Sequence, residues 1–225
     1  MAKKQQYSGT CFFCNQEFSK RGMGKHLQAC KARKASMEKL DQKKKKVFYQ
    51  LVAEDAYSRY YWLHLEMEGN TSLEKLDSYL RSIWLECCHH LSDFLEPGRG
   101  GSEIPMNKKI SSVFSPGMYL THIYDWGTSS ETNIRCTGIR KGAAMTRHPV
   151  LLMARNNMPE HICVECKKPA PFFCWECIRE FGAWEPLCET CVKDHECFED
   201  RQPGEIVNSP RMGMCGYDGP AEPPY

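Results

Sequence analysis

Eight cysteine and histidine residues between positions 163 and 197 constrain this chain more than any other feature. They form three C-x2-C pairs and one mixed pair: Cys163 and Cys166, Cys174 and Cys177, Cys188 and Cys191, His195 and Cys197. Eight such ligands are enough for two tetrahedral zinc ions. Four protein ligands per ion leave no position for water or substrate, which favours a structural role. A nucleophilic pair of Cys191 and His195 is the catalytic alternative, but it leaves the remaining thiols unexplained.

The four pairs can combine in two ways. In the alternating order, the first and third pairs hold one ion and the second and fourth pairs hold the other. Alternation is favoured over sequential pairing, because its longer loops let two pairs face each other without strain. The spacing also resembles the B-box zinc modules, which are cross-braced in this order. Two departures, the final Cys197 in place of a histidine and a longer segment before Cys188, make residues 161–200 a B-box-like two-zinc module.

A second metal motif lies near the N-terminus, with the spacing Cys11-x2-Cys14-x11-His26-x3-Cys30. His26 and Cys30 are four residues apart, so one helix presents both on the same face. Residues 1–34 therefore resemble a C2HC zinc finger of the ββα kind, and three zinc ions are expected per chain.

Charge divides the chain unevenly, although its formal net charge is only +2. Residues 1–50 contain 13 lysines and arginines against 3 acidic residues, whereas residues 161–225 contain 6 against 12. The basic head predicts attraction to nucleic-acid phosphates, and a single finger reads too few base pairs to be sequence-specific. The alternatives are a solvated basic helix and linker over 35–50, which includes the lysines at 43–46, and a finger that binds protein. The candidate contacts are Lys20, Arg21, Lys25, Lys31, Arg33 and Lys34.

The middle of the chain, residues 51–160, has the pattern of an α+β unit. Alternation over 59–68 predicts a half-buried strand, and Thr71 with Glu74 resembles a capping box. The following helix has apolar residues at helical spacing. Further strands are expected at 119–125, 130–139 and 149–154. The predicted inward side of the helix comprises Leu73, Leu76, Leu80, Ile83, Trp84 and Cys87.

Three stretches carry a resemblance to a known family: YYWLHLEMEGNTSLEKLDSYLRSIWLECCHHLSDF, PGMYLTHIYDWGTSSETNI and LLMARNN. They resemble the plasmid open-reading-frame-three-like family of prokaryotic mobile-element passenger proteins. The resemblance implies a small α+β roll, and a tail over 201–225 in which VNSPRMGMCGYDG is similar to that of some relatives. It implies no particular reaction and no catalytic residues.

The run ECCHH at 86–90 also contains potential ligands. Adjacent residues on a regular helix point about 100° apart, so Cys87, Cys88, His89 and His90 cannot all converge on one metal there. Core-facing cysteines and partly exposed histidines are expected instead. One cysteine and one histidine of this run could still combine with His122 or Asp125. Two remaining cysteines, Cys136 and Cys215, have no partner in the pattern and are expected to be buried thiols.

The N-terminus lacks the apolar core of a signal peptide, and no run is long enough to span a membrane. A cytoplasmic location is therefore expected, with no membrane partner and with the clustered cysteines, among the 14 of the chain, acting as ligands rather than in disulfides. The resulting hypothesis is a zinc-binding adaptor or regulator that contacts nucleic acid through its head and protein through its acidic module. A protein-only scaffold and an enzyme with a cleft in the central roll are the alternatives, and no catalytic residue is assigned.

Overall fold

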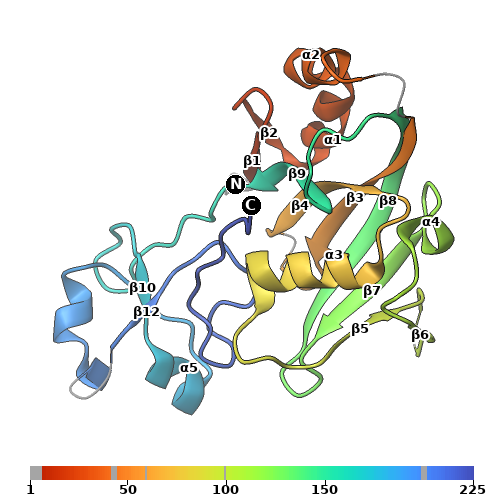
Figure 1. The fold of residues 1–225 in the computed structure, drawn as a ribbon. Coiled ribbons are helices and arrows are strands. Elements are labelled where there is room, and N and C mark those ends of the chain that lie inside the picture. Colours follow the sequence, from red (N-terminus) through yellow and green to blue (C-terminus); the bar gives the residue numbers. More distant parts are fainter. Residues whose placement is uncertain (1–6, 42–44, 59, 99, 199–201) are drawn as a thin grey trace.

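The computed structural model describes residues 7–41, 45–58, 60–98, 100–198 and 202–225. They form a mixed α and β fold around a large antiparallel sheet with few helices (Figure 1). The strands are β1 (Ser8–Cys11), β2 (Glu17–Ser19), β3 (Lys46–Asp55), β4 (Trp62–Glu68), β5 (Ser92–Leu95), β6 (Glu103–Ile104), β7 (Tyr119–Tyr124), β8 (Ser130–Gly142), β9 (Val150–Asn156), β10 (Phe172–Phe173), β11 (Pro186–Leu187) and β12 (Gly204–Glu205). The α-helices are α1 (Lys20–Ala29), α2 (Lys31–Glu38), α3 (Leu73–Leu80), α4 (Ile110–Val113) and α5 (Trp175–Phe181). A π-helix, η1 (Arg81–Leu85), and two 3-10 helices, η2 (Cys191–Asp194) and η3 (Glu196–Phe198), complete the helical elements of the described residues.

Within the described residues, nine strands form the large sheet in the order β2-β1-β9-β4-β3-β8-β7-β5-β6. A separate small sheet has the order β11-β10-β12. The strands expected at 119–125, 130–139 and 149–154 correspond to β7, β8 and β9. None of the helices in this described part of the chain is long and apolar enough to cross a membrane.

One face of the large sheet is covered by α3 and its continuation η1, which is a π-helix (Figure 1). The predicted apolar side is buried: Leu73, Leu76, Leu80, Ile83 and Trp84 are fully inaccessible to solvent. The predicted capping box is wrong, because the helix begins after Ser72, whose side chain makes no cap. The first two amides of α3 donate instead to the carbonyls of Lys108 and Met106, both at 2.9 Å. A neighbouring backbone segment thus replaces the side-chain cap.

Strand β4 is buried on both sides, so the expectation of a half-buried strand is wrong. Its outward residues are covered by the N-terminal unit, where Met23 and Leu27 of α1 pack with Trp62 in a second apolar cluster. The carboxylate of Glu66 is also buried there, and it accepts hydrogen bonds from Arg33 and Arg140. The alternating pattern predicted which residues of β4 share a side. It could not predict that the N-terminal unit, which is distant in sequence, covers the second side.

The N-terminal unit is joined to the sheet through its hairpin. Strand β1 pairs with β2 and also with β9, so the hairpin adds two strands at the sheet edge. Helix α2 and the first residues of β3 occupy much of the predicted linker at 35–50, of which residues 42–44 lie outside the described part.

The C-terminal tail, residues 202–225, returns to the large sheet beside α3 (Figure 1). The hydroxyl of Ser209 donates to the carbonyl of Trp84 at 2.5 Å. Arg211 is fully buried and donates to Asp125 at 2.6 Å and to the carbonyl of Thr128. The tail is therefore part of the main body of the protein.

Candidate metal centres

The N-terminal unit brings its four predicted ligands together. Cys11, Cys14, His26 and Cys30 have ligand atoms that all lie within 4.8 Å of one another. Helix α1 is capped by Ser19, the residue before it, whose hydroxyl accepts the amide N–H of Gly22 at 3.2 Å. The helix then carries His26 toward the hairpin, where its Nε2 lies 3.3 Å from Cys14 Sγ. The strand, hairpin and helix each contribute to one compact group.

The eight residues of the C-terminal module are grouped in the alternating order. Cys163, Cys166, Cys188 and Cys191 form one group, and Cys174, Cys177, His195 and Cys197 form the other, each within 4.8 Å. The first pair is thus grouped with the third and the second pair with the fourth, which is the order that the spacing favoured. The two groups interlock along the chain, which is the cross-braced arrangement.

The distances within these groups suit a tetrahedral ion. A zinc–sulfur bond of about 2.3 Å places two thiolates of a tetrahedron about 3.8 Å apart. The Sγ atoms of Cys177 and Cys197 are 3.8 Å apart, and those of Cys166 and Cys188 are 3.4 Å apart. All fourteen cysteines lie in the described part of the chain, and none forms a disulfide. The sulfurs are therefore at ligand spacing rather than bonded to each other.

The backbone favours the thiolate form at Cys163. Burial alone would raise the pKa of this thiol, but the amides of Cys166, Cys188 and Glu165 donate to the sulfur and lower the pKa to about 6. Similar amide contacts occur at the other pairs, from Cys177 to Cys174 Sγ and from Cys191 to Cys188 Sγ, both at 3.4 Å. Since the thiolate is the form that binds metal, these amides prepare the site for an ion.

The C-terminal module has only a small core besides its ligands, in which Phe173 is fully buried against Trp175 and Trp184. Its apolar cluster consists of Cys163, Ala170, Cys174, Cys177, Leu187 and Cys188. Most of these buried residues are ligand cysteines, in contrast to the large sheet, whose core is built from aliphatic and aromatic side chains. The module therefore depends on its ligand groups for a fixed structure.

A fourth group was not expected from the sequence. Cys87, Cys88, His90 and Cys215 also have ligand atoms within 4.8 Å of one another. The expectation of core-facing cysteines at a helix end is wrong, because η1 ends at Leu85, the residues after it form a loop, and Cys88 is exposed. Cys215 is exposed and lies in this group, so its expected place as a buried thiol is also wrong. Only the fold reveals this group, since Cys88 and Cys215 are 127 residues apart.

The other residues considered with this run are placed differently. His122 is fully buried and pairs with Asp77 at 2.8 Å, and it does not belong to the cysteine group. Asp125 approaches His90 Nε2 at 3.4 Å. Cys136 is buried at 1% exposure, as expected. The contact between His122 and Asp77 is thus a structural contact inside the sheet unit.

The structure changes the set of candidate nucleic-acid contacts. Arg33 must be removed from it, because the side chain is buried and donates to Glu66 Oε2 and to the carbonyl of Leu27, both at 3.0 Å. Lys20 is half-buried and forms an ion pair with Glu54 at 3.0 Å. The remaining four candidates are exposed on α1 and α2: Arg21, Lys25, Lys31 and Lys34. The basic surface is therefore smaller than the sequence suggested.

No family model matches this sequence, and no curated protein matches it significantly. Among solved structures, the chain is similar to a protein of unknown function, MM3350 from Methanosarcina mazei Go1, at 15% identity and a TM-score of 0.39. The match covers 46% of this chain and 66% of that chain. A likeness of this extent carries no argument, so the resemblance to the plasmid open-reading-frame-three-like family stays a prediction.

Proposed function

We propose that the chain is a zinc-dependent adaptor. In this proposal the N-terminal group and the two interlocked C-terminal groups each hold one zinc ion, which gives a C2HC finger and a B-box-like module on either side of an α+β roll. The observation that carries the zinc assignment is the ligand set itself. Thiolate and imidazole at tetrahedral spacing are the ligands of structural zinc sites.

The finger would contact nucleic acid through the exposed cations of α1 and α2. Arg21 and Lys25 are four residues apart on one helix, so they share its outer face, while Met23 and Leu27 are buried. Phosphate contacts of this kind release counterions and depend steeply on salt. If the four exposed cations make contact, affinity should fall about 100-fold between 50 and 200 mM salt, with little sequence preference.

The test compares two variants of equal charge change. Arg21→Gln, Lys25→Gln, Lys31→Gln and Lys34→Gln are combined in one protein. The control combines Lys75→Gln, Lys108→Gln, Lys109→Gln and Lys141→Gln, which are exposed residues of the sheet unit. DNA and RNA binding is measured by fluorescence anisotropy across a salt series. We expect the first variant to lose binding and the control to keep it. Equal binding by both variants, or no binding by the unchanged protein at 50 mM salt, would leave the protein-only scaffold as the better hypothesis.

The acidic C-terminal module would contact a protein partner. Phe181 at the end of α5 is 75% exposed, and it lies in a segment where acidic residues exceed basic ones. A photo-crosslinking amino acid at position 181 should give discrete protein adducts in cells. The same amino acid at Tyr119, an exposed aromatic residue of the sheet unit, is the control. Identical adduct patterns at both positions would contradict a partner at the module.

A further inference from the structure

We propose that Cys87, Cys88, His90 and Cys215 form a fourth zinc site, which fixes the C-terminal tail to the large sheet unit. Three of these residues follow η1, and the fourth comes from the tail. The site differs from the other three because its ligands come from segments far apart in the sequence. It therefore links two parts of the fold instead of stabilising one small unit.

The spacing of the four ligand atoms is that of a tetrahedral site. Cys88 Sγ lies 3.7 Å from both Cys87 Sγ and Cys215 Sγ, close to the 3.8 Å or so expected around zinc. The Nε2 atom of His90 lies 3.0 Å from Cys88 Sγ and 3.2 Å from Cys215 Sγ. These distances match those in the two histidine-containing groups described above, where a His Nε2 lies 3.3 Å from a cysteine sulfur.

The backbone adopts uncommon conformations where it presents these ligands. His89 has φ 62°, and Cys215 has φ 49°. Positive φ is unfavourable for residues other than glycine, and such residues gather at functional sites where the surroundings hold them. The turn at His89 directs Cys88 and His90 to the same point, while the ring of His89 itself remains outside the group.

Buried polar contacts fix the position of the C-terminal tail next to Cys87. Arg211, fully buried, donates to Asp125 Oδ2 at 2.6 Å and to Cys87 Sγ at 3.6 Å. The hydroxyl of Tyr124 also lies 3.6 Å from Cys87 Sγ. Three thiolates around a divalent ion leave one negative charge, which the adjacent guanidinium offsets. Outer contacts of this type orient ligands and stabilise the bound ion.

The ligand set identifies the class of metal and the role. Three thiolates and one imidazole favour zinc over the hard cations Mg²⁺ and Ca²⁺, which prefer oxygen. Four protein ligands close the coordination sphere, so the site is structural.

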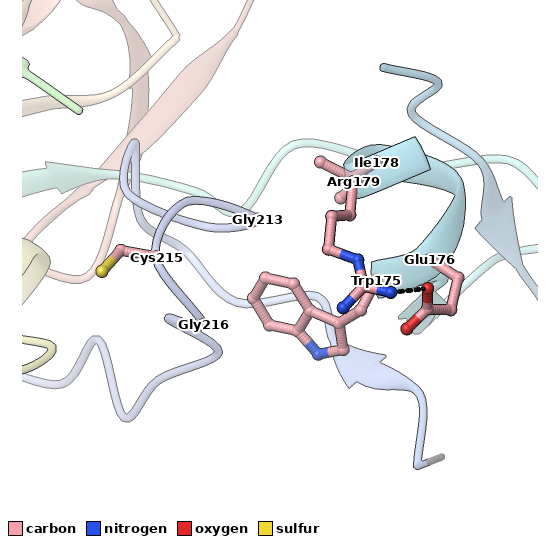
Figure 2. Close-up of a pocket in the computed structure, with 7 residues that line it drawn as sticks. All are labelled: Trp175, Glu176, Ile178, Arg179, Gly213, Cys215 and Gly216. Atoms are coloured by element: carbon pink, nitrogen blue, oxygen red, sulfur yellow. Dashed lines mark hydrogen bonds and ion pairs between the residues drawn. The ribbon is translucent and has the colours of Figure 1, made fainter. Parts of the chain in front are cut away.

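The tail also contacts the C-terminal module. A Cβ at Gly213 would lie 3.1 Å from Ile178 and 3.2 Å from Trp184, so the loop is packed closely against the module. Figure 2 shows the Cys215 side chain pointing away from Trp175 and Arg179 of α5. The same short loop thus touches the module on one side and supplies a ligand on the other. A metal ion at this point would hold the module in place on the sheet unit.

The experiment exploits two adjacent histidines. His90→Gln removes a ligand, and His89→Gln changes an exposed neighbour outside the group. Both proteins are prepared with zinc under reducing conditions, and metal per chain is measured by elemental mass spectrometry. We expect His90→Gln to hold one zinc fewer than His89→Gln, with the same loss in Cys215→Ser. Equal metal content in all three variants would overturn the proposal.

The number of metal sites in the unchanged protein can be measured without relying on how a variant folds. Cadmium-113 NMR of the cadmium-substituted chain should show four resonances, and Cys215→Ser should remove one and leave three in place. Three resonances in the unchanged protein, all retained in Cys215→Ser, would exclude a metal at this site. A Cys88–Cys215 disulfide in the reduced preparation, seen as a mass 2 Da lower, would equally contradict it. These outcomes are independent of nucleic-acid binding.

Discussion

Glu66 shows how a single charged residue joins the N-terminal unit to the sheet. Its side chain is 2% exposed, and it lies between Arg33 of α2 and Arg140 of β8. Burying charges is costly unless they are paired, so all three groups depend on one another. The cation that sequence analysis assigned to nucleic acid thus has a structural partner instead.

Replacing Glu66 by Gln should destabilise the protein by about 3–5 kcal/mol, because the buried guanidinium of Arg33 and the partly buried one of Arg140 lose their counter-charge. The matched control is Glu68→Gln on the same strand. Glu68 pairs with Lys46, whose side chain is 52% exposed, and this change should cost less than about 1 kcal/mol. Urea unfolding monitored by tryptophan fluorescence measures both values. Similar losses in the two variants would argue against a buried ion-pair network.

His64 predicts a measurable pH dependence. Burial, together with the positive charges of Arg135 and Lys20, lowers the pKa of His64 from 6.5 to about 4. The unfolded chain therefore binds this proton more readily than the folded chain does. The contribution of neutral His64 to the free energy of unfolding is fully present above pH 6.5 and is lost as the pH falls toward 4. At pH 5.5 the loss should be about 1 kcal/mol. His64→Gln should show a smaller decrease in unfolding free energy between pH 7.5 and 5.5, since all other groups titrate in both proteins. Parallel decreases would contradict a buried neutral histidine.

At the scale of elements, the pairing of β1 with β9 depends on one glycine. A Cβ at Gly9 would lie 2.3 Å from the carbonyl oxygen of Arg155 and 2.3 Å from the ring of Trp62. No L side chain fits without moving the strand. The hairpin can approach the sheet this closely because that position has no side chain.

Two glycine-to-alanine changes should therefore have opposite effects. Gly9→Ala should destabilise the protein by about 1–3 kcal/mol through overpacking. Gly24→Ala lies within α1, where its Cβ meets only His64 at an ordinary 3.7 Å. It should stabilise the protein by about 0.5–1 kcal/mol, because glycine weakens helix interiors. Thermal unfolding with metal present gives both values. A neutral Gly9→Ala would show that β1 is not tightly docked.

The elements that sequence analysis predicted correctly are those with a local signal. The ligand groups within Cys11–Cys30 and Cys163–Cys197 could be predicted because all the ligands of each group lie within a few tens of residues in the sequence. The apolar side of α3 is visible because periodicity is local. The second covered side of β4 and the group containing Cys88 and Cys215 depend on packing between distant segments. No pattern in a single sequence encodes such contacts.

On the scale of the whole molecule, two kinds of stability coexist. The large sheet unit is held by aliphatic and aromatic packing, with residues such as Leu51, Leu63 and Trp84 fully buried. The C-terminal module is held mainly by buried ligand cysteines. The two parts should therefore respond differently to removal of metal.

A strong zinc chelator should unfold the module over 163–198 and leave the large sheet folded, because most of the module's buried cluster consists of ligand cysteines. Hydrogen–deuterium exchange measured by mass spectrometry tests this directly. We expect protection to be lost in peptides that contain Cys174 and Cys188 and retained in β3 and β8. Loss of protection in all of these peptides together would show that metal binding and sheet folding are one cooperative process.

The pairing of β1 with β9 also sets an order of events during synthesis. Thr10 and Asn157, which contact each other across this pairing, are separated by 147 residues. At about 5–20 residues per second, the ribosome takes roughly 7–30 s to deliver the partner strand. The ligands of the N-terminal group, by contrast, are all present once Cys30 has emerged. The head of the nascent chain can thus acquire its ion and fold while the sheet edge that will receive it has not yet been translated.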